Sequence, residues 1–240
     1  NLLEESIAYQ QQTRKDFHFH HVSTDEVFGS LNMTDDLFKE SNQYKPNSPY
    51  SASKAASDHL VRAWSKTFGL NMTISNCSNN YGPNQNPEKL IPKTIVCCLK
   101  GEEIPIYGNG ENTRDWLYVD DHCNAIMKII LNAKRGSYYN IGGKNEITNI
   151  NLVTTICDYL DSHFAKDAIL PLSGRNKGID SFNELIKYVK DRPGHDLRYA
   201  IDSSKIEHEI GWIPSETFET GIKKTINWYL DNINWLRENI

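Results

Sequence analysis

Two short runs of residues carry side chains that could move protons. Ser23-Thr24-Asp25-Glu26 sets two carboxyls beside a hydroxyl, and Tyr50-Ser51-Ala52-Ser53-Lys54 places a phenol and an ammonium about one helical turn apart. A free phenol has a pKa of ~10, but a nearby ammonium stabilises the phenolate and lowers that pKa toward neutrality. A tyrosine in this setting could take a proton from an alcohol while hydride leaves the same carbon.

The neighbouring carboxyls Asp25 and Glu26 could divide two roles between them. Different burial splits the pKa values of such a pair, so that one carboxyl serves as an acid and the other as a base. This division suits the removal of water across a carbon–carbon bond. The residues alone leave plainer alternatives open: the carboxyls could cap a helix or end a solvated loop, and an isolated Y-x-x-x-K pair is commonly structural.

The elements that must position these runs follow from the hydrophobic pattern. A strand over 17–22 ends at the first run, and a turn-rich loop over 29–49 leads to the second. The second run opens a helix from Tyr50 to about Phe68, after Pro49 and before the stop residue Gly69.

The rest of the chain also alternates between helical and extended patterns. Within one helix we expect Ile126, Ile129 and Ile130 to face inward. Polar residues follow the strands, and in open α/β sheets ligands bind beyond the carboxyl ends of parallel strands. We therefore expect an α/β protein with a site at that edge of the sheet. The further elements that we expect are helices over 1–12, 91–99, 120–131, 149–160, 202–211 and from Thr217 onward, and strands over 72–77, 104–107, 138–141 and 186–189.

Composition narrows the class of protein. A formal charge of −5 and a pI near 5.9 argue against nucleic acid as a partner, although a local basic pocket for a phosphorylated small molecule stays open. Five cysteines without a CxxC pair suggest reduced core thiols. His18 and His20 share a strand face, but no further ligand stands at metal spacing, so we expect no metal site. Without an apolar run of ~20 residues or a signal pattern, we expect a cytoplasmic protein with no membrane contact.

Five motifs in order carry a resemblance to a known family. With them, the chain resembles the dTDP-glucose 4,6-dehydratases, which are extended short-chain dehydrogenases/reductases. Relatives that epimerise or decarboxylate sugar nucleotides share Y-x-x-x-K, whereas the consecutive Asp-Glu after Thr24 is typical of the dehydratases. Phe28 stands where tyrosine is common. The motifs are Ser23-Thr24-Asp25-Glu26-Val27, Tyr50-Ser51-Ala52-Ser53-Lys54, Asn76-Cys77-Ser78-Asn79-Asn80-Tyr81-Gly82-Pro83, Arg114-Asp115-Trp116-Leu117-Tyr118-Val119 and Asp191-Arg192-Pro193-Gly194-His195-Asp196.

The resemblance implies a reaction and a role for each catalytic residue. Tyr50 would take the proton of the sugar 4-hydroxyl, with Lys54 tuning it and holding the nicotinamide ribose, while NAD accepts hydride from C4. Thr24 would hydrogen-bond the same hydroxyl. Glu26 would remove the C5 proton and Asp25 would protonate the departing C6 hydroxyl. Return of the hydride to C6 would convert dTDP-glucose into dTDP-4-keto-6-deoxyglucose.

The resemblance also implies a substrate site. Tyr50, Lys54 and Asn80 would bind the cofactor. On their own chemistry, Arg114 and Arg192 suit diphosphate oxygens, although a surface salt bridge is the commoner role of an arginine. Tyr107 could equally be a core ring, and His195 could be a packed turn residue. The substrate-binding residues implied are Thr24, Asn79, Lys89, Leu90, Pro105, Tyr107, Arg114, Asn149, Arg192 and His195.

The implied architecture is a Rossmann-like doubly wound parallel sheet with a smaller α/β substrate-binding lobe. Residues 1–83 would form the remainder of the NAD-binding domain, and 84–240 mainly the sugar-nucleotide lobe, with some segments returning to the first domain. Such proteins bind dinucleotide through a Gly-rich turn, and no G-x-x-G-x-x-G precedes Thr24, so we expect an N-terminal part of the natural protein to be missing from this sequence. A homodimer through the Tyr50–Phe68 helix is also implied. The alternatives are an epimerase or decarboxylase of the same family, and a non-catalytic sugar-nucleotide-binding protein.

Overall fold

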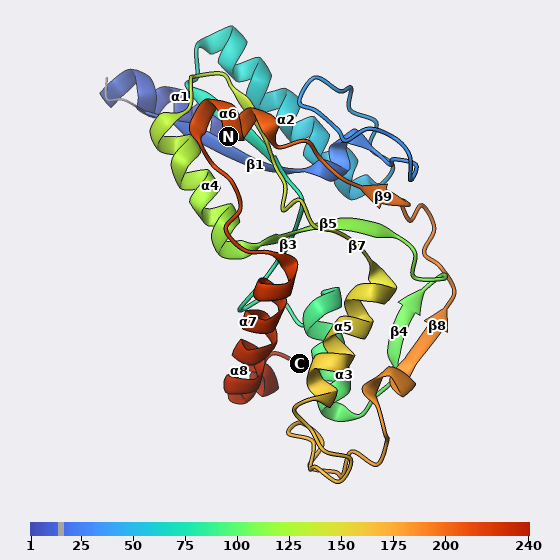
Figure 1. The fold of residues 1–240 in the computed structure, drawn as a ribbon. Helices are drawn as coiled ribbons and strands as arrows, with labels where there is room; N and C mark the ends of the chain where they lie inside the picture. Colours follow the sequence, from blue (N-terminus) through green and yellow to red (C-terminus); the bar gives the residue numbers. More distant parts are fainter. Residues whose placement is uncertain (14–16) are drawn as a thin grey trace.

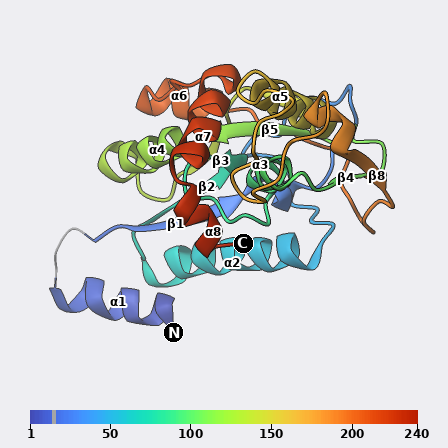
Figure 2. The same cartoon turned by 90° about the horizontal axis from the view of Figure 1, so that it is seen from below.

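A computed structural model describes residues 1–13 and 17–240, and in it two regions are joined by several passages of the chain (Figure 1). The first region is built on a parallel sheet in the order β1-β2-β6. Helices α1 and α2 cover one face of this sheet, and α4 and α6 lie on the other (Figure 2). Its elements are α1 (Leu2–Thr13), β1 (Phe19–Thr24), α2 (Pro49–Phe68), β2 (Met72–Cys77), α4 (Val119–Asn132), β6 (Tyr138–Ile141) and α6 (Ser204–Ile210).

Strand register in this sheet explains why polar residues gather at one edge. In the parallel pair β1 and β2, Thr24 stands opposite Cys77, and Cys77 stands opposite Ile141 of β6. The carboxyl ends of three strands therefore lie side by side. A short 3-10 turn, Asp25–Phe28, follows β1 at this edge.

Helix α2 begins and ends as its sequence predicts. Ser48 and Ser51 form a capping box, Pro49 occupies the first turn, and Gly69 ends the helix with a φ of 73°. The buried Asp58 fastens the helix to the sheet, since its carboxylate accepts hydrogen bonds from Ser23 Oγ (2.8 Å) and from Tyr44 Oη (2.9 Å). The helix is thus held in register with the end of β1.

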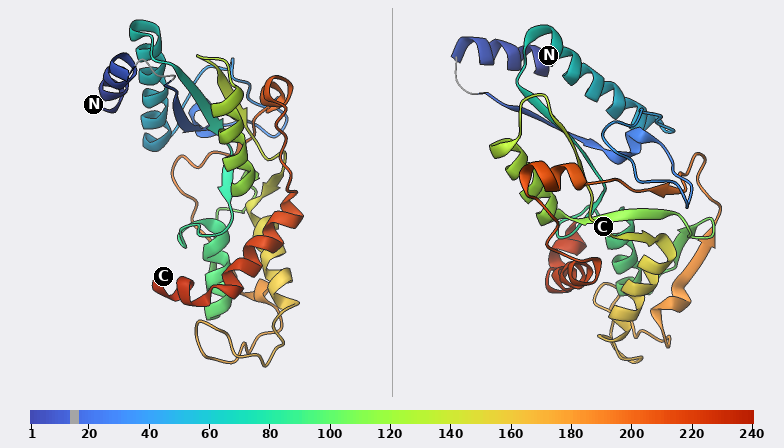
Figure 3. Two further views of the ribbon diagram at one scale, coloured as in Figure 1. Left: turned by 90° about the vertical axis from the view of Figure 1, so that its left-hand side faces the viewer. Right: turned by 45° about the horizontal axis from the view of Figure 1, so that its top comes forward.

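The second region holds the largest hydrophobic core and lies at the end of the molecule away from α1 (Figure 3). Strand β5 is its centre, because β3, β7 and β9 all pair with it, and β4 pairs separately with β8. Its elements are β3 (Asn79–Tyr81), α3 (Leu90–Lys100), β4 (Ile104–Tyr107), β5 (Thr113–Tyr118), β7 (Glu146–Thr148), α5 (Asn149–Asp161), the 3-10 turn Phe182–Leu185, β8 (Ile186–Val189), β9 (Arg198–Tyr199), α7 (Phe218–Asp231) and α8 (Ile233–Glu238).

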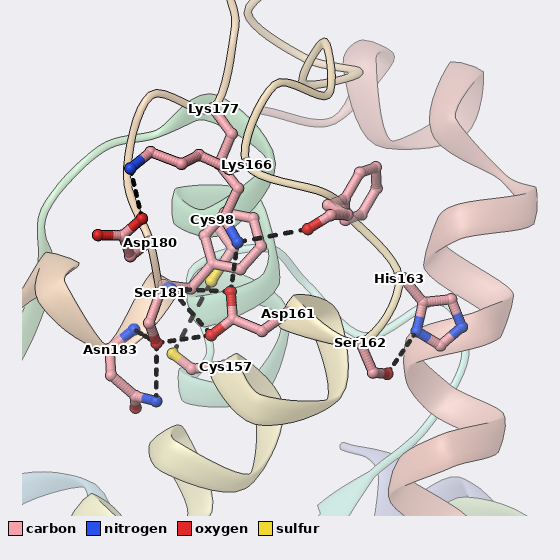
Figure 4. A network of polar contacts seen from close by, with 12 residues as sticks. Cys98, Cys157, Asp161, Ser162, His163, Lys166, Lys177, Asp180, Ser181 and Asn183 are labelled. Atoms are coloured by element: carbon pink, nitrogen blue, oxygen red, sulfur yellow. Dashed lines mark hydrogen bonds and ion pairs between the residues drawn. The ribbon is translucent and has the colours of Figure 1, made fainter.

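A polar network ties the long loop after α5 to that helix (Figure 4). Asp161 accepts hydrogen bonds from Lys177 Nζ (2.5 Å), Ser181 Oγ (2.6 Å) and the amide of Phe182 (3.0 Å). The Lys177 ammonium also lies 4.2 Å from the centre of the Phe182 ring. This network holds a segment that carries little secondary structure of its own.

Several predictions from sequence are wrong in detail. Ile130 is exposed, because it lies on the outer face of α4, whereas Ile129 is fully buried. The last helix is interrupted at Asn232, which separates α7 from α8. Cys123 is exposed, so not every cysteine is a core thiol. Strand β5 was not predicted as a strand.

The α/β class with parallel strands is confirmed. Among the described residues, no helix is long and apolar enough to span a membrane, and no cluster of three or more His, Cys, Asp or Glu could hold a metal ion.

Candidate active site

A cavity of about 910 Å³ lies where the two regions meet, and it gathers most of the residues that the sequence singled out. Glu26 lies at one part of its wall, directly after Thr24 and Asp25 in the chain. Of the ten predicted substrate residues, all but Thr24 line this cavity, as does Asn80. Those that line it are Asn79, Lys89, Leu90, Pro105, Tyr107, Arg114, Asn149, Arg192 and His195.

The buried carboxyl Asp25 is the most unusual group at the site. Its side chain is almost fully buried, Thr24 Oγ1 donates to its Oδ1 at 3.3 Å, and its Oδ2 has no hydrogen-bond partner among the described residues. Burial raises the pKa of Asp25 to about 8, and the nearby carboxylates of Glu26 and Asp115 add to the rise. Asp25 is therefore a protonated acid at neutral pH.

Glu26 has a different environment from its neighbour. It borders the cavity, and although partial burial raises its pKa, the cations of Arg114, Lys89 and Arg192 oppose the rise. These charges favour the carboxylate form, which is the form a base needs. The two carboxyls therefore have different environments, and the division into acid and base stays a prediction.

Tyr50 and Lys54 lie on the first turns of α2, as predicted, but they do not interact as expected. The Lys54 ammonium donates to the backbone oxygen of Val22 at 2.8 Å. Burial raises the pKa of Tyr50, and the charges of Glu26, Cys77 and Asp25 raise it further. The expectation that Lys54 lowers this pKa is wrong here, because burial dominates, the nearby carboxyls add to it, and the ammonium donates to a backbone oxygen instead.

Asn80 is oriented by a residue that the sequence reading missed. Its Nδ2 donates to the Ser78 carbonyl (3.0 Å), and its Oδ1 lies 2.8 Å from His122 Nδ1. Burial lowers the pKa of His122 to about 4, so the ring is neutral and donates from Nδ1 to Asn80. His122 stands in an Asp-Asp-His run at the start of α4, which offered no signal of this contact.

Arg114 is set into the cavity wall by the segment from 191 to 199. Its guanidinium donates to the carbonyls of Thr113 (2.8 Å), Leu197 (3.3 Å) and Asp196 (2.9 Å) and lies 4.4 Å from the centre of the Tyr199 ring. Tyr199 and Asp196 also line the cavity, and sequence reasoning missed both as single residues.

The last part of the wall pairs a cation with an aromatic ring. The Arg192 guanidinium lies 5.0 Å from the centre of the Tyr107 ring and donates to His195 Nε2 at 2.9 Å. His195 Nδ1 in turn donates to Asp191 Oδ1 at 2.7 Å. Burial lowers the pKa of His195, against the opposing effect of Asp191, so Nε2 stays free of a proton to accept from Arg192.

Comparison with known proteins gives consistent matches. A family model described as GDP-mannose 4,6 dehydratase matches residues 1–225. A dTDP-glucose 4,6-dehydratase of Escherichia coli is 52% identical over 246 residues, which cover 98% of this chain and 66% of that protein. Among solved structures, a dTDP-glucose 4,6-dehydratase of Bacillus anthracis in complex with NAD matches with 42% identity and a TM-score of 0.81, over 98% of this chain and 67% of that one.

A further solved structure is similar over the same extent. The dTDP-glucose 4,6-dehydratase of Streptomyces venezuelae, with NAD and a second ligand bound, has a TM-score of 0.84 and 39% identity, over 98% of this chain and 65% of that one. The chain therefore spans about two thirds of the length of the relatives it matches.

Proposed function

This chain belongs to the GDP-mannose 4,6-dehydratase family, and from that membership and the site we propose that it forms the substrate-binding and proton-transfer part of an NAD-dependent dTDP-glucose 4,6-dehydratase. The product would be dTDP-4-keto-6-deoxyglucose. The observation that carries the proposal is the contrast between the buried acid Asp25 and its neighbour in the chain, the cation-facing Glu26, which borders a cavity that nine predicted substrate residues line.

The described residues fit the nicotinamide-ribose half of NAD. Tyr50 presents a half-exposed phenol, and Lys54 and Asn80 offer further polar groups beside the ends of β1 and β2. A Gly-rich turn for the diphosphate is absent from the printed sequence. When bound, NAD would supply a hydride acceptor and a positive charge in this place.

The protein's own groups would then handle the protons. As a phenolate, Tyr50 would accept the proton of the 4-hydroxyl, and the Lys54 ammonium and the positive charge that NAD brings would favour that form over the phenol present in the structure. Thr24 Oγ1, at the end of β1, would hydrogen-bond the same oxygen. Once C4 is a ketone, the C5 proton is acidic, and the Glu26 carboxylate would remove it. Asp25 would give its proton to the departing C6 hydroxyl, which leaves as water. Glu26 would return its proton to C5 as hydride reaches C6. The proton taken up by Tyr50 would pass to solvent, and Asp25 would regain one from solvent, so that one water is the net loss.

The cavity supports a sugar linked to a nucleoside diphosphate as the substrate class. Lys89, Arg114 and Arg192 bring positive charge to one wall, and planar guanidinium groups match diphosphate oxygens. The Tyr107 ring is 41% exposed, so one face is available for a flat base, with Arg192 beside it.

The test uses protein expressed from its complete gene, with any residues that precede Asn1 included. It is incubated with dTDP-glucose, and the product is identified by mass and by absorbance of the 4-keto sugar in alkali. We expect loss of one water per substrate with no net change in NAD. Conversion to dTDP-galactose would point to an epimerase instead, and binding of dTDP-glucose without turnover would point to a binding protein.

The homodimer through α2, the cytoplasmic location and the domain division at residue 83 stay predictions. Sedimentation of the purified protein at several concentrations would test the first of these.

A further inference from the structure

Asp196 is a buried carboxylate that the proposed reaction does not use. It lies in the segment 191–199, which runs from β8 to β9 between the two regions (Figure 1). Its side chain borders the cavity, yet both oxygens are engaged by protein groups: Asn47 Nδ2 donates to Oδ1 at 2.7 Å, and the Tyr199 hydroxyl donates to Oδ2. A group so placed could bind ligand only by giving up these partners.

The partners of Asp196 come from both regions. Asn47 stands three residues before Tyr50, in the loop that leads into α2, whereas Tyr199 lies on β9, which pairs with β5. The carbonyl of Asp196 accepts from Arg114 Nη2 (2.9 Å) and from Asn112 Nδ2 (3.2 Å). One residue therefore connects the approach to Tyr50 with the strand that carries Arg114.

The contact with Tyr199 fixes the surroundings of Arg114 as well. The Tyr199 ring packs against the Arg114 guanidinium, so the hydrogen bond to Asp196 holds the ring in that place. The three hydrogen bonds of Arg114 all go to backbone carbonyls, which leaves two of its five N–H groups for a ligand. The direction of those two groups depends on the segment that Asp196 anchors.

Asp196 also acts on Glu26 through its charge. The groups that face Glu26 are Asp25 from the 3-10 turn, Tyr50 from α2, Lys89 before α3, Arg114 from β5, Tyr199 from β9, and Arg192 and Asp196 from the connecting segment. Of these, Asp196 is a carboxylate that opposes ionisation of Glu26, while the three cations favour it.

We propose that Asp196 is a positioning residue of the dehydratase reaction: it locks segment 191–199 to the loop before Tyr50 and sets Arg114 through Tyr199. Its charge beside Glu26 is a second, electrostatic contribution. The inference rests on the proposed function. It assigns Asp196 no contact with the reacting atoms.

Two substitutions separate the geometric from the electrostatic role. Asp196→Ala removes both acceptors, so we expect kcat/KM for dTDP-glucose to fall roughly 10- to 100-fold and the affinity for dTDP, measured by calorimetry, to fall with it. Asp196→Asn keeps the hydrogen bonds, because the Tyr199 hydroxyl can turn to accept, and removes only the charge. The pKa of Glu26 then drops, its carboxylate persists to lower pH, and the acid limb of the pH profile of kcat/KM moves to lower pH.

Asp121 provides the matched control. It is equally buried and accepts three hydrogen bonds, from Ser215 N, Ser215 Oγ and Glu216 N, but it does not line the cavity. Asp121→Ala should lower the melting temperature as Asp196→Ala does, without moving kcat/KM or the acid limb when assayed well below that temperature.

The outcomes are distinguishable. A wild-type protein that does not convert dTDP-glucose overturns the proposed function, and the dTDP affinities of the variants still test the geometric role. The inference is overturned if the wild-type protein is active, Asp196→Ala keeps kcat/KM within twofold of it, and the acid limb of the pH profile of Asp196→Asn coincides with that of wild type. Equal effects of Asp121→Ala on kcat/KM would likewise reduce Asp196 to a general contributor to stability.

Discussion

Asp25 and Asp161 are carboxyls withdrawn from solvent in the two regions, and their environments are opposite. Burial would raise the pKa of Asp161, but hydrogen bonds from Lys177, Ser181 and Phe182 outweigh it, and the pKa is lowered. Asp25 has one weak hydrogen bond, from Thr24, and no ion pair with a cation of residues 1–13 or 17–240, and burial raises its pKa to about 8. The hydrogen bonds around Asp161 stabilise its negative charge, whereas the surroundings of Asp25 favour the protonated, neutral carboxyl.

This difference separates a carboxyl that holds the fold together from one that we propose takes part in the reaction. A buried charge is tolerated where partners satisfy it. Asp25 has a single weak partner, and the cost of burying such a carboxyl is better explained by function than by stability. The comparison predicts that changes at Asp25 affect turnover and changes around Asp161 affect unfolding.

The strongest test of the comparison is Asp25→Asn. Loss of a positioned acid reduces rates by about 10²–10⁴-fold, so we expect kcat for dTDP-glucose dehydration to fall by roughly 10³-fold. The melting temperature should not fall, because an amide replaces a neutral carboxyl. Asp180→Asn, at an exposed position, serves as the control and should leave kcat unchanged. An active Asp25→Asn enzyme would contradict the assignment of the acid.

Asp25 and Asp161 should make the free energy of unfolding depend on pH with opposite signs. The folded pKa of Asp25 lies above its unfolded value near 4, so between pH 4 and 8 the folded state holds the extra proton and stability falls as pH rises, by up to ~1.4 kcal/mol per pH unit. Asp25→Asn should remove this dependence. The pKa of Asp161 is lowered, so its contribution is present above pH 4 and is lost as the solution is acidified through its folded pKa.

Chemical denaturation at pH 5, 6, 7 and 8 measures these slopes. The same proton sets the rate, so kcat should decline above about pH 8, where Asp25 ionises. A wild-type protein whose stability rises steadily from pH 5 to 8 would show that Asp25 is ionised in the folded state.

The sequence predicted those features of the site that depend on neighbouring residues, and it predicted poorly those that depend on contacts between distant segments. The helix around Tyr50 was predictable because its cap Ser48, Pro49 and the stop Gly69 are local signals. The nine cavity residues came from matching motifs to a family, since no periodicity places Lys89 near Arg192. Their convergence on one cavity could be seen only in the folded chain.

Other parts of the site lay beyond such reasoning. Strand β5 was missed because it is buried along its whole length and carries Arg114 and Asp115 inside the protein, so it lacks an alternating pattern. The raised pKa of Tyr50 follows first from burial in the folded chain and then from carboxyls about 25 residues away in sequence. Asp196 showed no separate signal, because its partners Asn47 and Tyr199 are brought to it by tertiary folding.

Lys177→Met tests the structural half of the comparison. The Lys177 side chain is nearly inaccessible, and its removal leaves Asp161 without a cation, which costs about 3 kcal/mol for a buried pair. Chemical denaturation should show this loss, while kcat at 25 °C stays within twofold of wild type because the network lies outside the cavity lining. A large fall in kcat of Lys177→Met with its free energy of unfolding unchanged would show that the Asp161 network serves the reaction rather than the stability of the fold.

The smallest expected effect comes from the neighbouring ion pair, and it tests whether burial is what matters. Lys166 Nζ lies 2.5 Å from Asp180 Oδ1, as short as the Lys177 contact, but both side chains are mostly exposed. Solvent screens an exposed pair, and holding two long side chains in one geometry costs entropy, so Lys166→Met should leave the denaturation midpoint unchanged within error. Added salt should make no difference to that result. If Lys166→Met destabilised the protein as much as Lys177→Met, the contact distance rather than burial would govern the strength of these pairs, and the contrast drawn between Asp161 and Asp25 would lose its physical basis.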